Sequence, residues 1–219
     1  MGSYFGQLIS LALITLPLQV AANDTATYPS SDTNGNTAQQ ALIVLGDSIS
    51  AGYGIRAEQG WVELLDNSLQ ENEQEWYVVN ASISGDTTGG GLARLPALLE
   101  THEPGMVIIE LGGNDGLRGY PVNKIETNLH KMVELVKAQG ATPVIAAMRI
   151  PPNYGPRYTR AFDGVFAKVA QQQQVTLIPF LLEQVALAEG MMQSDGIHPT
   201  AEAQPLLLQA VWPVIEPLL

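Results

Sequence analysis

Short apolar runs alternate with longer amphipathic stretches along most of the chain, beginning at Ala41. Each apolar run is four to six residues long, which is the length of a buried strand and too short for a buried helix. The pattern therefore predicts repeated strand–helix units and a parallel sheet. The five predicted strands are Ala41–Leu45, Trp76–Asn80, Met106–Leu111, Pro143–Met148 and Val175–Ile178.

Helical patterns fill the segments between these strands and follow the last of them. The stretch Val122–Gln139 is the clearest, because its apolar residues recur at helical spacing while Lys and Glu occupy the other side. Gly140 then stands where a left-handed cap commonly ends a helix. The predicted helices are Gly60–Gln70, Gly91–Thr101, Val122–Gln139, Tyr158–Gln172 and Thr200–Leu219.

The N-terminal segment is different. Leu8–Leu18 is an apolar run with the length of a signal-peptide core, and Val20-Ala21-Ala22 has the small residues that suit cleavage. No Lys or Arg precedes the run, so an uncleaved or buried N-terminal helix stays open as an alternative. Residues 23–40 are rich in small polar residues, which predicts a flexible linker. We expect a signal peptide over 1–22, this linker, one domain over 41–219, and a periplasmic or secreted protein.

Composition narrows the classes of function. Hydrophobic residues make up 46% of the 219 residues and charged residues 15%, which is ample for a core without staples. The absence of Cys excludes disulfides, thiolate nucleophiles and zinc sites with sulfur ligands. His102 and His130 have no second ligand at metal-binding spacing, so no metal site is predicted. The formal net charge of -12 would repel a phosphate backbone, so nucleic acid is not expected as a partner.

Polar, glycine-containing loops follow the first three predicted strands. They are Gly46-Asp47-Ser48-Ile49-Ser50, Ala81–Asp86 and Gly112-Gly113-Asn114-Asp115. In an open α/β sheet, ligands bind outside the carboxyl ends of the strands. The three loops are therefore predicted to meet at one edge of the sheet, with Asp47, Asp86 and Asp115 bracing them.

Ser48 is the candidate nucleophile, because it opens a predicted strand-to-helix turn where its hydroxyl can face solvent. By itself, Gly-Asp-Ser is more often a turn or a helix cap. Near the other end of the chain, Asp195 precedes His198 by three residues. Asp195 can then accept from one ring nitrogen, which leaves the other free to take a proton from Ser48. The alternative is a turn made by Asp195 and a helix cap made by His198.

Acyl transfer also needs hydrogen-bond donors for the oxyanion that forms. Gly85 has no side chain, so its backbone N–H can approach a reacting carbonyl closely. The side-chain amide of Asn114 and the backbone N–H of Ser48 are the other candidate donors. Taken one loop at a time, Gly and Asn are also ordinary left-handed turn formers.

Four segments together resemble, in order, the conserved blocks of the SGNH or GDSL-type hydrolases. They are Gly46-Asp47-Ser48, Gly85, Gly112-Gly113-Asn114-Asp115 and Asp195-x-x-His198-Pro199. The resemblance extends from Ala41 to about Pro213 and is close to the branch of bacterial periplasmic thioesterases, lysophospholipases and arylesterases. Ile49 stands where the family usually has Leu.

The resemblance implies a flavodoxin-like, three-layer α/β fold, in which a five-stranded parallel sheet has helices on both faces. It implies a catalytic triad of Ser48, Asp195 and His198, and an oxyanion hole formed by Ser48, Gly85 and Asn114. It further implies a serine esterase that hydrolyses acyl esters and thioesters through an acyl-enzyme, with no metal or organic cofactor. We expect a monomer that acts on small-molecule substrates and has no stable membrane anchor.

The segment Arg149–Tyr154 follows the fourth predicted strand, and its prolines predict a stiff apolar wall for an acyl chain. Leu117, Ile150 and Pro151 are therefore expected to bind substrate, with ordinary loop packing as the alternative. Two other functions remain open from the sequence: a carbohydrate deacetylase on the same fold, and a flavodoxin-like binding module without catalysis.

Overall fold

The computed structural model describes residues 39–72 and 75–219. The predicted signal peptide and nearly all of the predicted linker lie outside these residues. The compact unit that contains them begins at Thr37 and ends at Leu219. Among the described residues, no helix has both the length and the apolar character needed to cross a bilayer.

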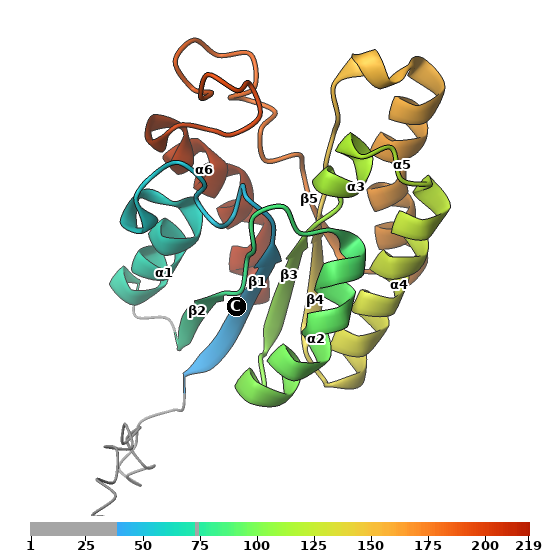
Figure 1. Ribbon diagram of the computed structural model, residues 1–219. Helices are drawn as coiled ribbons and strands as arrows, with labels where there is room; N and C mark the ends of the chain where they lie inside the picture. Colours follow the sequence, from blue (N-terminus) through green and yellow to red (C-terminus); the bar gives the residue numbers. More distant parts are fainter. Residues whose placement is uncertain (1–38, 73–74) are drawn as a thin grey trace, which may run out of the picture. The chain divides into compact units, whose positions relative to one another are not determined.

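A five-stranded, all-parallel sheet forms the centre of this unit, with strand order β2-β1-β3-β4-β5 (Figure 1). The strands are β1 (Gln40–Gly46), β2 (Trp76–Asn80), β3 (Met106–Glu110), β4 (Thr142–Ala146) and β5 (Thr176–Ile178). Each apolar run of the sequence thus becomes a strand, with ends that differ from the prediction by no more than two residues.

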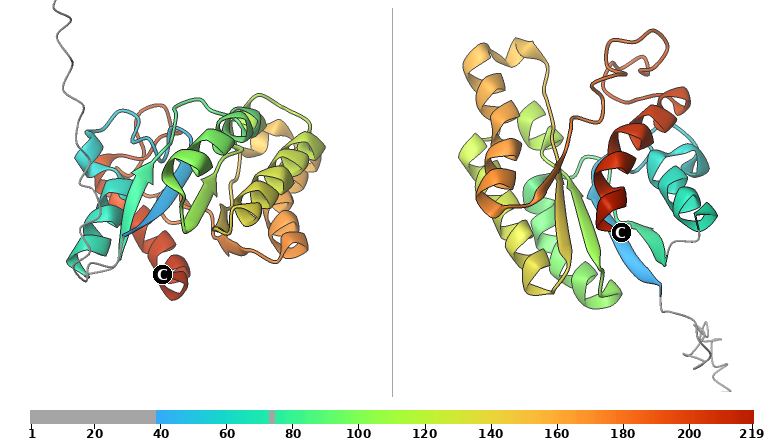
Figure 2. Two further views of the ribbon diagram at one scale, coloured as in Figure 1. Left: turned by 90° about the horizontal axis from the view of Figure 1, so that it is seen from below. Right: turned by 180° about the vertical axis from the view of Figure 1, so that it is seen from behind.

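Helices cover both faces of the sheet, as Figure 2 shows. In β1, Leu42 and Val44 pack against the helices on one face, while Ile43 and Leu45 pack against the helices on the other. Because both faces are covered, the strands are near-continuous apolar runs rather than alternating ones. The predicted α/β fold with helices on both faces is confirmed. The α-helices are α1 (Trp61–Glu71), α2 (Thr88–His102), α3 (Gly113–Leu117), α4 (Val122–Ala138), α5 (Pro156–Gln173) and α6 (Gln204–Ile215).

Short helical segments depart from the predicted pattern. The single helix expected from Thr200 to Leu219 is broken into two 3-10 turns flanking α6, because Pro205 suits a first turn and Pro217 cannot continue a ladder of backbone hydrogen bonds. The third loop, Gly112–Asp115, was expected to be irregular but begins α3. The 3-10 helices are η1 (Ala57–Gln59), η2 (Pro152–Tyr154), η3 (Ala201–Ala203) and η4 (Glu216–Leu218).

The order of the strands reverses between β1 and β3. The chain runs from β1 to β2 on one side, and then returns to place β3, β4 and β5 on the other. At such a switch point the loops leave the sheet in opposite directions and open a crevice at the carboxyl ends of the strands. The loops that carry Ser48 and Asn114 leave β1 and β3 at this point.

Candidate active site

The nucleophile candidate Ser48 lies two residues beyond the end of β1. The chain does not enter a helix there, contrary to the prediction, since it makes successive turns before η1 and only reaches α1 at Trp61. The turn is held by Asp47, whose carboxylate accepts from Ile49 N at 3.1 Å and whose carbonyl accepts from Ala51 N at 2.9 Å. Ser48 is therefore presented by a turn, without a helix dipole behind it.

The structure brings Ser48, His198 and Asp195 together. His198 Nε2 lies 2.8 Å from Ser48 Oγ, and His198 Nδ1 lies 2.6 Å from Asp195 Oδ2. The other carboxylate oxygen of Asp195 accepts from the backbone N–H groups of Ile197 and His198, at 2.9 and 3.0 Å. The turn that the sequence left as an alternative thus exists, and it aims the carboxylate at the imidazole.

These hydrogen bonds fix the charge of Asp195. The bond from His198 is the largest cause, followed by those from the two backbone N–H groups, and together they lower the pKa of Asp195 to about 2. The group is therefore a carboxylate at neutral pH, which suits a partner that orients an imidazole and stabilises its protonated form.

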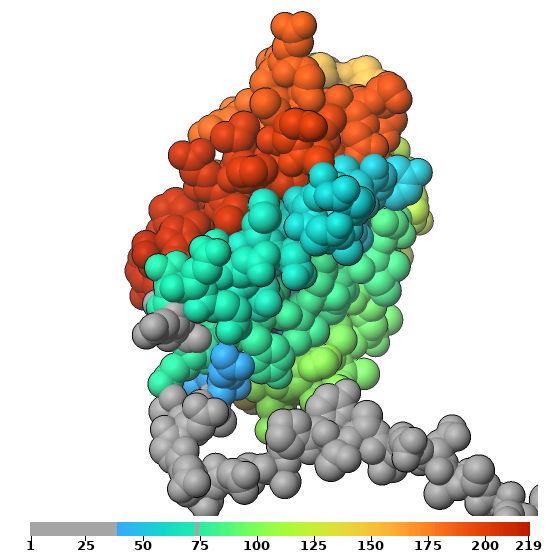
Figure 3. All heavy atoms as spheres, turned by 90° about the vertical axis from the view of Figure 1, so that its left-hand side faces the viewer, coloured from blue at the N-terminus to red at the C-terminus, as the bar shows by residue number. Residues whose placement is uncertain are grey.

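Hydrogen bonds hold the His198 loop in shape, and further contacts join it to the Ser48 loop. Gln193 N donates to His198 O at 2.8 Å, and the ring of Tyr53 lies 4.4 Å from the His198 ring. Gln193 Nε2 donates to Tyr53 O at 2.8 Å and to Pro199 O at 3.0 Å. Figure 3 shows the loop after β1, in cyan, lying against the orange-red loop that follows β5.

The three predicted oxyanion donors lie in the segments that directly follow β1, β2 and β3, at the same edge of the sheet. Gly85 has a φ of 79° in a turn that is closed by Asp86 N donating to Ile83 O at 3.0 Å. Asn114 lies in the first turn of α3, and its Nδ2 donates to Asp47 Oδ2 at 3.1 Å. Since an amide nitrogen carries two protons, Asn114 keeps one for another acceptor.

Two carboxyl groups lie beneath the Ser48 turn. Glu110, the last residue of β3, is buried and accepts from Ser50 Oγ at 2.7 Å and from Asp47 N at 3.3 Å. Burial, and then the neighbouring Asp47, raise the pKa of Glu110 well above its ordinary value. Burial also raises the pKa of Asp47 to about 6, against the hydrogen bonds from Ile49 and Asn114 and the nearby His198.

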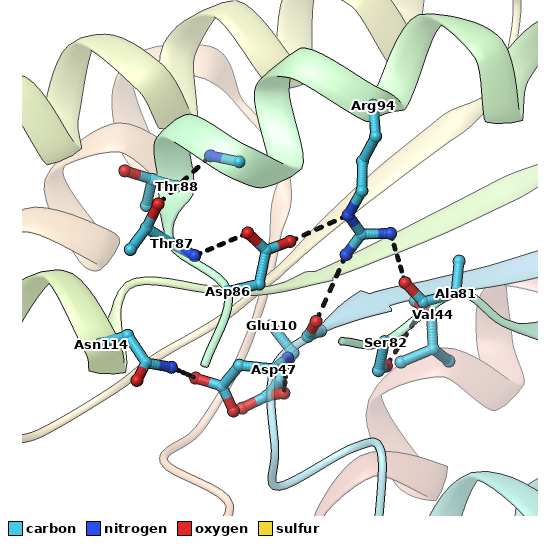
Figure 4. Close-up of polar contacts among 12 residues, drawn as sticks. Val44, Asp47, Ala81, Ser82, Asp86, Thr87, Thr88, Arg94, Glu110 and Asn114 are labelled. Carbon is cyan, nitrogen blue, oxygen red and sulfur yellow. Dashed lines mark hydrogen bonds and ion pairs between the residues drawn. The ribbon is translucent and has the colours of Figure 1, made fainter. Parts of the chain in front are cut away.

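The role of Glu110 was missed in the sequence. It was read as part of a strand, although a lone charged residue in an apolar run of five was the available signal. The bracing predicted for the other loop carboxylates is present. Asp115 accepts from Thr88 N and Thr88 Oγ1 at 2.8 and 2.7 Å. Asp86 Oδ2 accepts from Arg94 Nε at 2.8 Å (Figure 4).

A cavity of about 450 Å³ opens beside Ser48, Asn114 and His198. Leu117, Ile150 and Pro151, the residues expected to bind substrate, all line it. The segment after β5 supplies a further apolar side that sequence reasoning missed, because a loop without periodic apolar spacing gives no sign of which residues face a ligand. These additional lining residues include Phe180, Leu181, Leu182, Leu187 and Ile197.

The cavity has a size typical of small-molecule sites, and few polar groups converge on it. It is suited to an acyl chain whose carbonyl carbon reaches Ser48. Across residues 39–72 and 75–219, no three His, Asp or Glu side chains are grouped so that they could hold a metal ion.

The sequence model of the GDSL-like lipase/acylhydrolase family matches residues 44–205 of this chain. The chain belongs to this family. It is 53% identical over 182 residues to esterase TesA of Pseudomonas aeruginosa, an alignment that covers 83% of this chain and 90% of that protein. It is 46% identical over 181 residues to thioesterase 1/protease 1/lysophospholipase L1 of Escherichia coli, covering 83% of this chain and 86% of that protein.

A solved structure is also similar. Esterase EstA from Pseudoalteromonas sp., crystallised in a form inhibited by monoethylphosphonate, matches with a TM-score of 0.79 and 42% identity, over 82% of this chain and 98% of that one. The family resemblance stated from the sequence is therefore confirmed, and this GDSL-like acylhydrolase is a serine hydrolase acting on ester bonds.

Proposed function

We propose that the protein hydrolyses acyl esters and thioesters through an acyl-enzyme on Ser48, with His198 as the base and Asp195 as its orienting partner. The observation that carries this proposal is the continuous hydrogen-bonded path from Ser48 Oγ through both ring nitrogens of His198 to Asp195. The names of the two curated relatives, an esterase and a thioesterase/lysophospholipase, support the same substrate range.

Each step follows from this geometry. As Ser48 Oγ bonds to the carbonyl carbon, its proton passes to His198 Nε2 and the carbonyl electron pair moves onto oxygen. The N–H groups of Ser48 and Gly85 and the amide of Asn114 stabilise that oxyanion. The tetrahedral intermediate collapses, and the alcohol or thiol leaves with the proton from Nε2. Water then attacks the acyl carbon while His198 takes its proton. The second tetrahedral intermediate collapses, the bond to Ser48 Oγ breaks, the carboxylic acid leaves, and His198 returns the proton to Ser48.

The cavity beside Ser48 supports an acyl-chain site. Its apolar lining, which includes Leu117, Ile150 and Pro151, offers dispersion contacts and burial to methylene groups. A sugar acetate would need convergent hydrogen-bonding groups, so the lining favours fatty acyl esters over the deacetylase alternative. A panel of p-nitrophenyl esters and acyl thioesters against acetylated sugars separates the two. A preference for the sugars would contradict the acyl-chain assignment.

Ser48→Ala tests the chemistry directly. The variant should lose turnover of p-nitrophenyl esters by at least about 10⁴-fold, because no other group replaces the nucleophile. A fluorophosphonate probe should label the wild type and leave the variant unlabelled. Labelling or near-normal turnover in Ser48→Ala would show that another residue is the nucleophile.

We also infer that the protein is exported and that its catalytic domain is the segment 41–219. The support is the signal-peptide pattern of residues 1–22 and the compact unit that begins at Thr37. Cell fractionation and N-terminal sequencing of the mature protein test this, with cleavage expected after Ala22. An intact N-terminus in the cytoplasmic fraction would contradict it. We propose a monomer, which sedimentation of the purified protein tests.

A further inference from the structure

Arg94 of α2 is largely buried, and each of its three guanidinium nitrogens has a hydrogen-bond partner. Its side chain is 21% exposed and pairs with Asp86, which is 11% exposed, through a 2.8 Å contact between Arg94 Nε and Asp86 Oδ2. The other guanidinium nitrogens donate to main-chain carbonyls, Nη1 to Ala81 O and Nη2 to Gly46 O at 3.4 Å. The planar guanidinium group therefore links three groups: the carboxylate of Asp86 and the backbone carbonyls of Ala81 and Gly46 (Figure 4).

Two of these contact sites, Gly46 and Asp86, lie close in sequence to proposed oxyanion donors. Gly46 ends β1 two residues before Ser48, and Asp86 directly follows Gly85. The carbonyl of Gly46 also accepts from Ile83 N at 3.0 Å, which joins the end of β1 to the turn that contains Gly85. The separation between the N–H groups of Ser48 and Gly85 thus depends on this backbone bond and on the contacts of Arg94 with Gly46 and Asp86.

The Gly85 turn is held at two places, since Arg118 Nη2 donates to Gly85 O at 3.0 Å while Arg94 holds the Asp86 end. The bond from Asp86 N to Ile83 O closes the turn, and the positive φ of Gly85 leaves a residue with wide conformational freedom at its centre. The carboxylate of Asp86 is held from both sides, since Thr87 N donates to its Oδ1 at 2.8 Å while Arg94 holds Oδ2. The last residue of the turn is therefore fixed to α2.

We propose that Arg94 is a positioning residue for the oxyanion hole, which it keeps in shape by fixing the Asp86 side of the Gly85 turn to the end of β1. Arg94 touches no reacting atom. It acts through the separation of the Ser48 and Gly85 N–H groups, and this inference rests on the function proposed above. Displacements of about 1 Å at a catalytic group can cost about 10²-fold in rate.

Arg94→Lys is the first test. The variant keeps the charge, but a single ammonium group cannot reach the Asp86 carboxylate and the carbonyls of Ala81 and Gly46 together. We expect kcat for a p-nitrophenyl ester to fall by about 10- to 100-fold while KM changes by less than about twofold, because the acyl cavity is untouched. An unchanged kcat would overturn the proposal.

A second substrate separates positioning from general damage. The thionoester analogue carries C=S in place of C=O, so its tetrahedral intermediate places a large, weakly accepting sulfur at the oxyanion hole. Damage confined to the hole should lower the ester rate more than the thionoester rate, so the ester-to-thionoester ratio should fall in Arg94→Lys. Equal losses on both substrates would show a structural role alone and overturn the proposal.

Two reference variants complete the experiment. Lys168→Ala breaks an ion pair with Glu126 between α5 and α4, outside the site, and should leave kcat and the ratio unchanged. Asn114→Ala removes a proposed oxyanion donor and should lower the ratio. If Asn114→Ala leaves the ratio unchanged, the proposed oxyanion hole is wrong. If the ratio falls in Asn114→Ala and stays constant in Arg94→Lys, the inference about Arg94 alone fails.

Asp86→Asn provides a second route if Arg94→Lys does not fold. The amide keeps the size of the carboxylate and an oxygen that can accept from Thr87 N, but it loses the charge that pairs with Arg94. We expect the ester-to-thionoester ratio to fall about three- to tenfold, which is less than in Arg94→Lys. A wild-type ratio in a folded Asp86→Asn protein would overturn the proposal.

Discussion

The carboxyl of Asp47 lies between the nucleophile and the oxyanion hole. It accepts from Ile49 N in the Ser48 turn and from Nδ2 of Asn114, so one side chain orients both. Burial is nevertheless the dominant influence on this group, and it raises the pKa of Asp47 to about 6. The hydrogen bonds that favour the charged form therefore offset only part of its desolvation.

This raised pKa predicts a pH-dependent stability. Between pH 4 and pH 6 the folded protein keeps the Asp47 proton while the unfolded chain has lost it, so the free energy of unfolding falls as pH rises. The contribution is of order 2 kcal/mol, or several degrees in Tm for a domain of this size. Asp47→Asn removes it, so Tm of the variant minus Tm of the wild type should increase from pH 4 to pH 7. A difference that is constant across this range in thermal melts would contradict the assignment.

At the scale of elements, the site depends on how two distant loops are joined. The Ser48 loop follows β1 and the His198 loop follows β5, and these strands are not neighbours in the sheet. The side chain of Gln193 links them, because its two amide protons bind the carbonyls of Tyr53 and Pro199. The packing of the Tyr53 ring on His198 adds a second contact between the same loops.

Gln193→Met should therefore impair chemistry more than binding. Methionine keeps the length of the side chain but donates no hydrogen bond, so the Ser48–His198 distance should become more variable. We expect kcat for a p-nitrophenyl ester to fall about tenfold at nearly constant KM. Gln70→Met is the matched control, since it removes a 3.2 Å bond from Gln70 Nε2 to Trp76 O between α1 and β2. A control that loses as much kcat as Gln193→Met would show that the effect is not local.

Elements of this fold differ in how far the sequence determines them. Strands such as Met106–Glu110 and helices such as Val122–Ala138 follow from apolar spacing, because burial sets both the spacing and the structure. The five-residue helix α3 has too few residues for a period and depends on tertiary contacts, such as Gly113 N with Met148 Sδ.

The site residues also divide into those that a local sequence pattern reveals and those that depend on tertiary contacts. Ser48, Asp195 and His198 were predicted because they lie in local motifs with familiar spacing. Arg94 gave no signal, since a charged residue in a helix reads as a solvated one until the strands that it contacts are in place. The contacts of such residues join segments far apart in the chain, and a pattern along one segment cannot show them.

Net charge acts on the whole molecule and on the choice of substrate. The formal charge is -12, and since residues 1–38 contain two Asp and no Lys, Arg or Glu, the remainder still carries -10. Such a field repels an anionic substrate before it reaches the site, and it leaves a neutral substrate unaffected. The repulsion is screened over about 10 Å at 0.1 M salt.

An acyl-CoA thioester and a neutral thioester of the same acyl chain should therefore respond differently to salt. Raising NaCl from 0.02 to about 0.3 M shortens the screening length from roughly 20 Å to roughly 6 Å, so KM for the anionic acyl-CoA should fall severalfold. KM for the matching N-acetylcysteamine thioester should change little, because it carries no charge, and kcat for both should stay constant. Steady-state kinetics across the salt series measure this. Equal responses of the two thioesters would mean that CoA does not experience the protein's net field on its way to Ser48, and that a local cation such as Arg149, which lines the cavity, outweighs it.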